Sequence, residues 1–233
     1  MEFAMNDSDI ESRARQVQQQ NMLVKQLRDS GHEEEADRLK ETYHSREMSG
    51  LAADVYRAAK HDGEPPAGWT RASTDPAALR AAGINMTDDE LQRHLQPTQS
   101  GFRAEIYLPD KRVLGQDAKP VLVYKGSTGE IIDPSVPAGH RESLGEDFLN
   151  NGMQGIGMRS DYYDRAMTLA SLVNSRSSGG FEIAGHSLGG GMASAASAVT
   201  GARATTFNAA GLHPATASRY AKDNGLPTFD TGQ

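Results

Sequence analysis

Hydrophobic residues follow helical spacing through the first part of the chain. Up to residue 60 the sequence is rich in helix-forming residues and lacks proline, and apolar residues recur at helical intervals, among them Ile10, Val17, Val24 and Leu27. The stretch DSGHEEEAD, residues 29–37, interrupts this pattern. Its serine and glycine can end one helix, and its acidic residues suit the first turn of the next because the start of a helix is positive. We therefore predict a helical hairpin, an extension over residues 1–62.

Residues 63–100 are predicted to form a linker that contains one short helix. The stretch DGEPPAGWTRASTDP, residues 62–76, is rich in Pro, Gly, Ser and Thr, which is typical of an irregular loop. Further on, Thr87 and Glu90 have the spacing of a capping box, in which each side chain hydrogen-bonds the backbone of the other residue. The helix is therefore expected near TDDELQRHL, residues 87–95.

The hydrophobic pattern changes beyond residue 101. Short apolar runs typical of strands occur in FRAEIYL, PVLVYKG, GFEIAG and ATTFNAAG, at residues 102–108, 120–126, 180–185 and 204–211. Two stretches with the period of a helix packed on a sheet lie between the later strands, at residues 161–175 and 190–201. Strand, helix, strand, helix and strand in succession are typical of a parallel α/β sheet. Residues 101–233 are therefore predicted to form an α/β core around a mostly parallel sheet.

Composition and charge exclude several classes of partner. The chain has 233 residues and a formal net charge of −7, and its acids and bases are interspersed, so it offers no basic stripe to nucleic acid. No stretch approaches the roughly 20 apolar residues of a membrane span, and the first residues lack the basic and apolar pattern of a signal peptide. We expect a soluble protein made in the cytoplasm, without a transmembrane segment. Because it has no cysteine, it has no cysteine nucleophile.

A small polar triplet follows the strand predicted in GFEIAG. In Gly185-His186-Ser187-Leu188-Gly189 the serine falls at the junction between that strand and the next helix, which is the context of a G-x-S-x-G nucleophile elbow. Such a turn holds the serine in a strained conformation, and glycines two positions before and after it remove Cβ atoms that would collide. Ser187 is therefore the predicted nucleophile. The alternative is a glycine-rich turn that only packs the helix against the sheet.

A second turn offers the hydrogen-bond donors that acyl transfer needs at the oxyanion. One N–H normally comes from the residue after the nucleophile, and another from a loop after an earlier central strand. The strand VLVY ends in Lys125-Gly126-Ser127. The N–H groups of Leu188 and Ser127 are therefore the predicted pair, with the Ser127 hydroxyl as an extra donor. The alternative is an ordinary polar turn, and a phosphate-binding loop is disfavoured because the Gly-Lys-Ser/Thr ending is missing.

Together these two turns resemble the class 3 lipase-type α/β hydrolases. That family shows an Arg-Gly-Thr turn after a buried strand and Gly-His-Ser-Leu-Gly-Gly at the elbow, where this chain has Lys125-Gly126-Ser127 and residues 185–190. Lysine and serine are departures from the family pattern. Within the group, FLNNGMQGIGMRSDYYDRAMTLA before the elbow and TFNAAGLHP after it look most like bacterial lipase-like proteins that include antibacterial secreted phospholipase effectors.

The resemblance implies an α/β-hydrolase-like fold and hydrolysis of a carboxylic ester in a glycerophospholipid or acylglycerol, through an acyl-enzyme. The serine chemistry itself requires no metal or other cofactor. If the effector resemblance holds, the lack of a signal peptide fits a toxin exported by a dedicated secretion system, and an immunity or inhibitor protein is an implied partner. The helical extension would then serve as a delivery, lid or partner-docking element.

The histidine and acid that a serine nucleophile needs are not evident in the expected chain order. In this fold the order is serine, then an acid, then histidine. After Ser187 the only histidine is His213, no Asp or Glu lies between them, and the later acids are Asp223 and Asp230. His140, on the loop after the oxyanion strand, is the other candidate base. We expect instead that the chain is a fragment whose core is incomplete at its C-terminus, with the acid and histidine further along a longer protein.

A second hypothesis belongs to another functional class. Without its triad the chain would be a non-catalytic hydrolase-like interaction module, or an effector fragment recognised by an inhibitor or immunity protein. A longer parent sequence with an acid and a histidine in order favours the enzyme. A natural stop at Gln233 favours the module.

Overall fold

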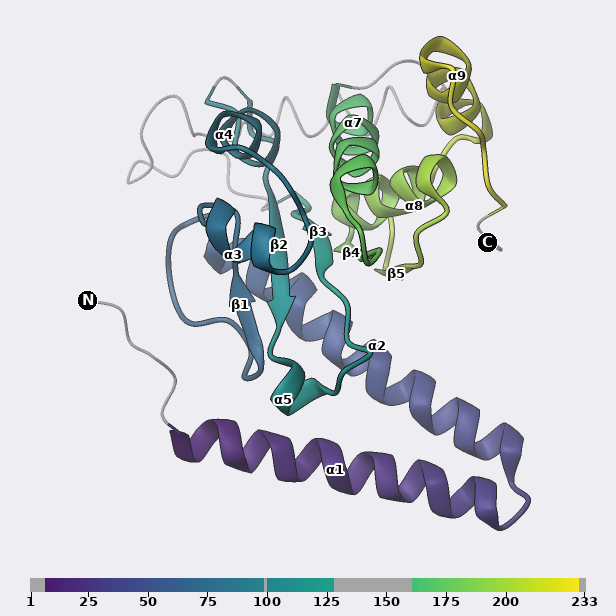
Figure 1. The fold of residues 1–233 in the computed structure, drawn as a ribbon. Coiled ribbons are helices and arrows are strands. Elements are labelled where there is room, and N and C mark those ends of the chain that lie inside the picture. The colour runs from purple at the N-terminus through teal and green to yellow at the C-terminus, as the bar shows by residue number, and fades with distance from the viewer. Residues whose placement is uncertain (1–6, 99, 128–160, 231–233) are drawn as a thin grey trace.

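One mixed sheet forms the centre of the molecule (Figure 1). The computed structural model describes residues 7–98, 100–127 and 161–230. Within them the strands lie in chain order: β1 (Trp69–Arg71), β2 (Ala104–Pro109), β3 (Val121–Tyr124), β4 (Glu182–His186) and β5 (Ala204–Phe207). β1–β2 and β2–β3 are antiparallel pairs, whereas β3–β4 and β4–β5 are parallel. The fold is therefore α/β, but a mostly parallel sheet is not confirmed.

The connections explain why the sheet is mixed. β2 joins β3 through a short segment that holds only the one-turn helix α5 (Lys111–Leu114), which suits an antiparallel pair. The parallel half has helical connections: α7 (Asp161–Arg176) leads into β4, α8 (Leu188–Thr200) joins β4 to β5, and α9 (Pro214–Asn224) follows β5. In the parallel register Tyr124 lies beside Gly185. The turns that follow β3 and β4 therefore leave the sheet at the same edge.

The N-terminal helices form a hairpin, and only part of it touches the sheet. α1 (Asp7–Asp29) and α2 (Glu33–Ala58) run in opposite directions and are joined by a turn at Gly31, whose φ of 81° favours glycine. The second half of α2 buries Met48, Leu51 and Val55 against the sheet. α1 lies alongside α2, away from the strands (Figure 1). The hairpin is therefore anchored to the core by α2.

The sheet separates two apolar clusters, and successive residues of β3 alternate between them. Leu122 and Tyr124 belong to the larger cluster, together with residues of α7 and α8. Val121 and Val123 belong to the smaller cluster, together with residues of α2. Helices therefore cover both faces of the sheet at β3, which is typical of the α/β class.

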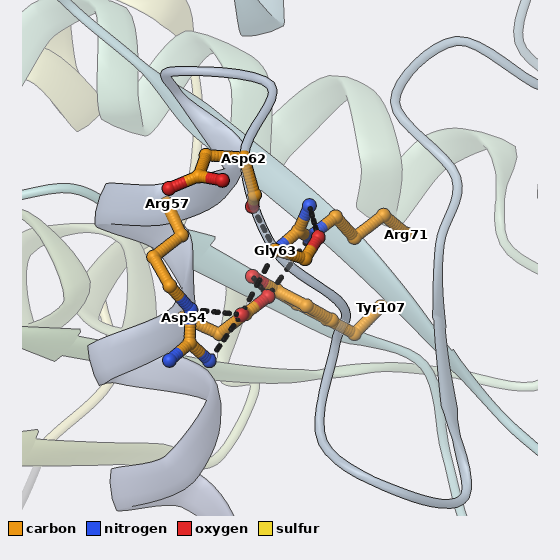
Figure 2. A network of polar contacts seen from close by, with 6 residues as sticks. All are labelled: Asp54, Arg57, Asp62, Gly63, Arg71 and Tyr107. Carbon is orange, nitrogen blue, oxygen red and sulfur yellow. Dashed lines mark hydrogen bonds and ion pairs between the residues drawn. The ribbon is translucent and has the colours of Figure 1, made fainter. Parts of the chain in front are cut away.

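Asp54 of α2 joins the hairpin to the antiparallel half of the sheet through hydrogen bonds (Figure 2). Its side chain is fully buried. Arg71 of β1 donates to this carboxylate from Nε and Nη2, each at a distance of 2.9 Å. The Tyr107 hydroxyl of β2 donates at 2.8 Å, and Arg57 donates at 2.7 Å. Burial raises the pKa of Asp54, but the hydrogen bonds from the two arginines and the tyrosine outweigh it and hold the pKa below its ordinary value. Asp54 is therefore a buried carboxylate whose charge is balanced by arginine and whose oxygens accept hydrogen bonds.

Two short helices precede β2 in the segment that looks like a linker in the sequence. They are α3 (Pro76–Ala81) and α4 (Asp88–Leu95), and both pack into the larger cluster, through Leu79 and Leu91. The capping box that the sequence predicted at the start of α4 is confirmed. Glu90 N–H donates to Thr87 Oγ1 over 3.3 Å, and Thr87 N–H donates to Glu90 Oε2 over 2.9 Å. Among the described residues, no helix is both long and apolar enough to cross a membrane.

Replacing Thr87 with alanine is expected to lower the free energy of unfolding by about 0.5–2 kcal/mol, because Glu90 N–H in the first turn loses its acceptor. Thr42 provides the matched control. It is exposed within α2 and its hydroxyl donates only to a carbonyl of its own helix, so Thr42→Ala is expected to leave stability unchanged or to raise it slightly. Urea denaturation of both variants measures the difference, and equal effects would contradict the assigned cap.

Candidate active site

Ser187 lies at the junction of β4 and α8 with a strained backbone. Its φ of 57° and ψ of −126° are outside the regions that non-glycine residues prefer. Ser187 N–H donates to Phe207 O over 3.0 Å, and its carbonyl accepts from Gly190 N–H and Ala210 N–H, each over 2.9 Å. The hydrogen bonds to β5, to α8 and to the segment after β5 hold this conformation in place.

The hydroxyl of Ser187 does not serve the helix that it begins. A serine at this position usually has an extended backbone and accepts a hydrogen bond from the first turn. Here φ is positive, and the hydroxyl makes no capping bond to α8. The residue is partly exposed. Ser187 therefore presents a hydroxyl at the start of a helix, where N–H groups and the positive end of the dipole gather.

The glycines on either side of Ser187 allow close packing of backbone on backbone. A Cβ at Gly185 would lie 2.8 Å from Gly190 N, inside the first turn of α8. A Cβ at Gly189 would collide with the Tyr124 carbonyl oxygen and lie 3.0 Å from Gly126 N. The start of α8 is thus pressed against the end of β3. Only glycine fits at these positions without moving one of the two turns.

The second predicted turn, Lys125-Gly126-Ser127, lies against the first. A Cβ at Gly126 would stand 2.5 Å from the His186 carbonyl oxygen and 3.4 Å from Gly189 N. Leu188 is buried and opens α8, so its N–H is one of those without an acceptor inside the helix. The Ser127 Oγ atom is buried and has no hydrogen-bond partner among the residues that the structure describes. The structure thus brings together the two predicted turns, and one of them contains a buried hydroxyl.

A lysine and a tyrosine that sequence reasoning did not assign to the site also contact these turns. Lys125 is 5% exposed, its Nζ donates to Gly126 O over 3.3 Å, and it stands 5.4 Å from the centre of the Tyr56 ring. The Tyr56 hydroxyl lies 3.3 Å from His186 Nδ1. His186 therefore faces α2. No local pattern could have revealed this contact, because Tyr56 and His186 are 130 positions apart in the sequence.

His213, one of the two histidines considered as bases, is held at the start of α9. His213 caps α9, where its Nδ1 accepts from Ala215 N–H over 3.2 Å. In a serine triad that nitrogen carries the proton that is donated to the acid. His140 lies outside the described residues. Within the part of the chain that the structure describes, no hydrogen bond joins a histidine to the Ser187 side chain, and no group of three or more metal-ligating residues occurs.

Comparison with known proteins places these residues in a phospholipase context. A family model described as a phospholipase-like, Tle-like phospholipase domain matches residues 47–230. The extracellular phospholipase A1 of Serratia liquefaciens is 33% identical over 173 residues, which cover 74% of this chain and 44% of that protein. The chain therefore spans less than half the length of the curated relative that it matches. The family match begins within α2, so it includes Tyr56 as well as both turns.

Proposed function

The chain belongs to the Tle-like phospholipase domain family, and we propose that it forms the α/β-hydrolase-like core of a serine esterase that hydrolyses phospholipid carboxylic esters through an acyl-enzyme on Ser187. The observation that carries the proposal is the conformation of Ser187, a non-glycine residue at positive φ whose hydroxyl does not cap its helix. Strain of this kind clusters at functional sites. The phospholipase A1 relative supports a phospholipid ester as the substrate.

In the proposed reaction the Ser187 Oγ attacks the acyl carbonyl carbon, and its proton passes to a general base. The N–H groups of Leu188 and Ser127, with the Ser127 hydroxyl, stabilise the negative charge that develops on the carbonyl oxygen. The bond from the acyl carbon to the glycerol oxygen then breaks, that oxygen takes the proton from the base, and the lysophospholipid leaves. Water releases the fatty acid from Ser187 by a second passage through the same steps.

The general base has three candidate sources. His213 offers only its Nε2, because its Nδ1 accepts a hydrogen bond from the backbone of α9. His140 is the second candidate within the chain. The third is a histidine in further sequence of a longer protein, as expected for a fragment, and the relative is more than twice as long as the part matched here. We favour this third source.

The proposal extends to a secreted role. The relative is an extracellular phospholipase A1, which supports export of the protein to which this chain belongs. An antibacterial effector would also need a cognate immunity protein, and the resemblance of the elbow region to secreted phospholipase effectors supports such a partner. A hydrolase-like module without catalysis is the alternative outcome of the test below, because the described residues place no base at Ser187.

Fluorophosphonate labelling tests the proposed nucleophile. An activated serine attacks the phosphorus, an O–P bond forms, and fluoride leaves. We expect intact mass spectrometry to find one adduct, and Ser187→Ala to abolish it. Ser175→Ala is the matched control and is expected to leave labelling unchanged, because that serine is exposed near the end of α7 and donates to a carbonyl of its own helix.

The form of the protein that labels identifies the source of the base. Labelling of a longer parent alone, lost in Ser187→Ala, would locate the missing triad residues outside this chain. Labelling of this chain as well would point to His213 or His140. If neither form labels while circular dichroism shows both folded, the esterase proposal fails and the interaction module is favoured.

A further inference from the structure

We propose that Lys125 is a positioning residue that fixes and polarises the Gly126–Ser127 peptide, and that Tyr56 of α2 seats its ammonium group. This inference rests on the proposed function, in which the Ser127 N–H binds the oxyanion. Lys125 Nζ donates to Gly126 O over 3.3 Å. That carbonyl belongs to the same peptide unit as the Ser127 N–H. Lys125 therefore contacts the opposite end of the group that would stabilise the transition state.

Because of peptide geometry, this contact also fixes the direction in which the Ser127 N–H points. The peptide unit is planar, and in the trans form its C=O and N–H bonds point to opposite sides. A carbonyl held by an ammonium group therefore holds its N–H pointing away from that group. Gly126 has no side chain of its own to restrict the rotation of this peptide. Lys125 thus reduces the orientations open to the Ser127 N–H.

Burial of Lys125 also strengthens the electrostatic effect of its contact with the Gly126 carbonyl. Lys125 is 5% exposed, so the interaction between its charge and the peptide is weakly screened by water. A cation at the carbonyl oxygen draws electron density through the amide, which strengthens the N–H as a donor. The positive charge also lies near the turn at which an oxyanion would form. Both effects act on the transition state more strongly than on a neutral ester.

Tyr56 links this lysine to the nucleophile turn. The Lys125 Nζ stands 5.4 Å from the centre of the Tyr56 ring, a distance suited to a cation–π interaction. The Tyr56 hydroxyl lies 3.3 Å from His186 Nδ1 and 2.5 Å from the place that a Cβ of Gly126 would occupy. One side chain of α2 therefore contacts the turn after β3 and the last residue of β4, directly before Ser187. In this arrangement the helical hairpin contributes directly to the geometry of the site.

Four variants test the inference, in the form of the protein that fluorophosphonate labels. Lys125→Met keeps the length of the side chain and removes its charge, and we expect the labelling rate to fall about 10- to 100-fold. In ester hydrolysis, kcat should fall while KM is unchanged. Lys125→Arg keeps a cationic donor and should retain most of the rate. Tyr56→Phe keeps the ring beside the ammonium group and removes the hydroxyl contact with His186. The labelling rate should then fall about fivefold, the worth of one ordinary hydrogen bond. Lys119→Met, the same change at an exposed site before β3, should have no effect.

A spectroscopic readout separates this inference from the proposed function. The ¹H and ¹⁵N resonances of the Ser127 amide in this chain are expected to shift in Lys125→Met and to return toward wild type in Lys125→Arg. Melting temperatures identify any variant that fails to fold, and for such a variant Lys125→Arg and Tyr56→Phe supply the comparison. Labelling by Lys125→Met within twofold of wild type, or an unmoved Ser127 amide, would overturn the inference while the nucleophile stands. If wild type does not label, the esterase proposal fails and the amide resonance alone decides the contact.

Discussion

Replacing Asp54 with alanine is expected to lower the free energy of unfolding by about 3–5 kcal/mol. The carboxylate is fully buried and neutralises Arg71, which donates to it from two nitrogen atoms, while the Tyr107 hydroxyl donates to the same group (Figure 2). Alanine would remove the carboxylate that accepts hydrogen bonds from this guanidinium and this phenol. Urea denaturation at neutral pH measures the loss. A variant within about 1 kcal/mol of wild type would show that Asp54 does not tie α2 to the sheet.

Asp62 supplies the control for this network. Its backbone carbonyl accepts from Arg71 Nη2 over 3.0 Å, but its side chain is exposed. Asp62→Ala removes an exposed carboxylate and keeps the backbone carbonyl that accepts from Arg71, so it is expected to change stability by no more than about 0.5 kcal/mol. A large effect of both variants would mean that general charge balance, rather than the buried contact, stabilises this region.

The sign of the pH dependence follows from the pKa of Asp54. Hydrogen bonds from the arginines and the tyrosine hold this pKa below its ordinary value in the folded protein, despite burial. The charge of Asp54 therefore contributes stability that is fully present above about pH 4, near the unfolded value, and is lost as the pH falls through the folded pKa. The difference in stability between wild type and Asp54→Asn should shrink over that acidic range.

Local patterns in the sequence predicted the features that local contacts create. Thr87 and Glu90 are three positions apart, and the capping box that their spacing predicts is present at the start of α4. Ser187 likewise stands where the apolar run of β4 meets the small residues of α8. In both cases the residues that interact, or that define the junction, are neighbours along the chain. One short stretch therefore carries the whole signal.

Contacts between distant segments left no comparable signal. Trp69–Arg71 is too short to show alternation and lies among prolines and glycines, so the strand it forms was not predicted. Asp54 looks like any helical surface acid until Arg71 and Tyr107 are brought beside it. The direction of β2 is also absent from its pattern, because an alternating strand looks the same in parallel and antiparallel pairs. The sequence therefore predicted the α/β class but not the mixed sheet.

Candidate residues show the same division between local and distant information. His213 drew interest as the only histidine after Ser187, yet its neighbours along the chain make it the cap of α9. In the sequence, Lys125 stands out only as a departure from the family pattern. Its contacts with Gly126 O and the Tyr56 ring give it a structural setting that the turn sequence alone does not contain.

Replacing Gly189 with alanine is expected to destabilise the fold by about 1–3 kcal/mol and to reduce labelling of the remaining folded protein about 100-fold. The new Cβ would collide with the Tyr124 carbonyl oxygen and approach Gly126 N to 3.0 Å. Both neighbours are backbone, so neither can turn aside as a flexible side chain would. The turn after β3 must instead move away from α8, which carries Ser127 away from Leu188. A displacement of about 1 Å at reacting groups is enough for a loss of this size.

Gly50 separates this collision from the ordinary effect of glycine in a helix. It lies within α2, and a Cβ there would meet only the Pro66 side chain at 3.6 Å, an ordinary contact. Gly50→Ala is therefore expected to raise stability by about 0.5–1 kcal/mol, opposite in sign to Gly189→Ala. Gly189→Ala would also destabilise the fold if the turn only packed the helix against the sheet and had no catalytic role. The fall in labelling per folded molecule is expected only if the two turns jointly form the oxyanion site, so a folded Gly189→Ala protein that labels at the wild-type rate would contradict that assignment.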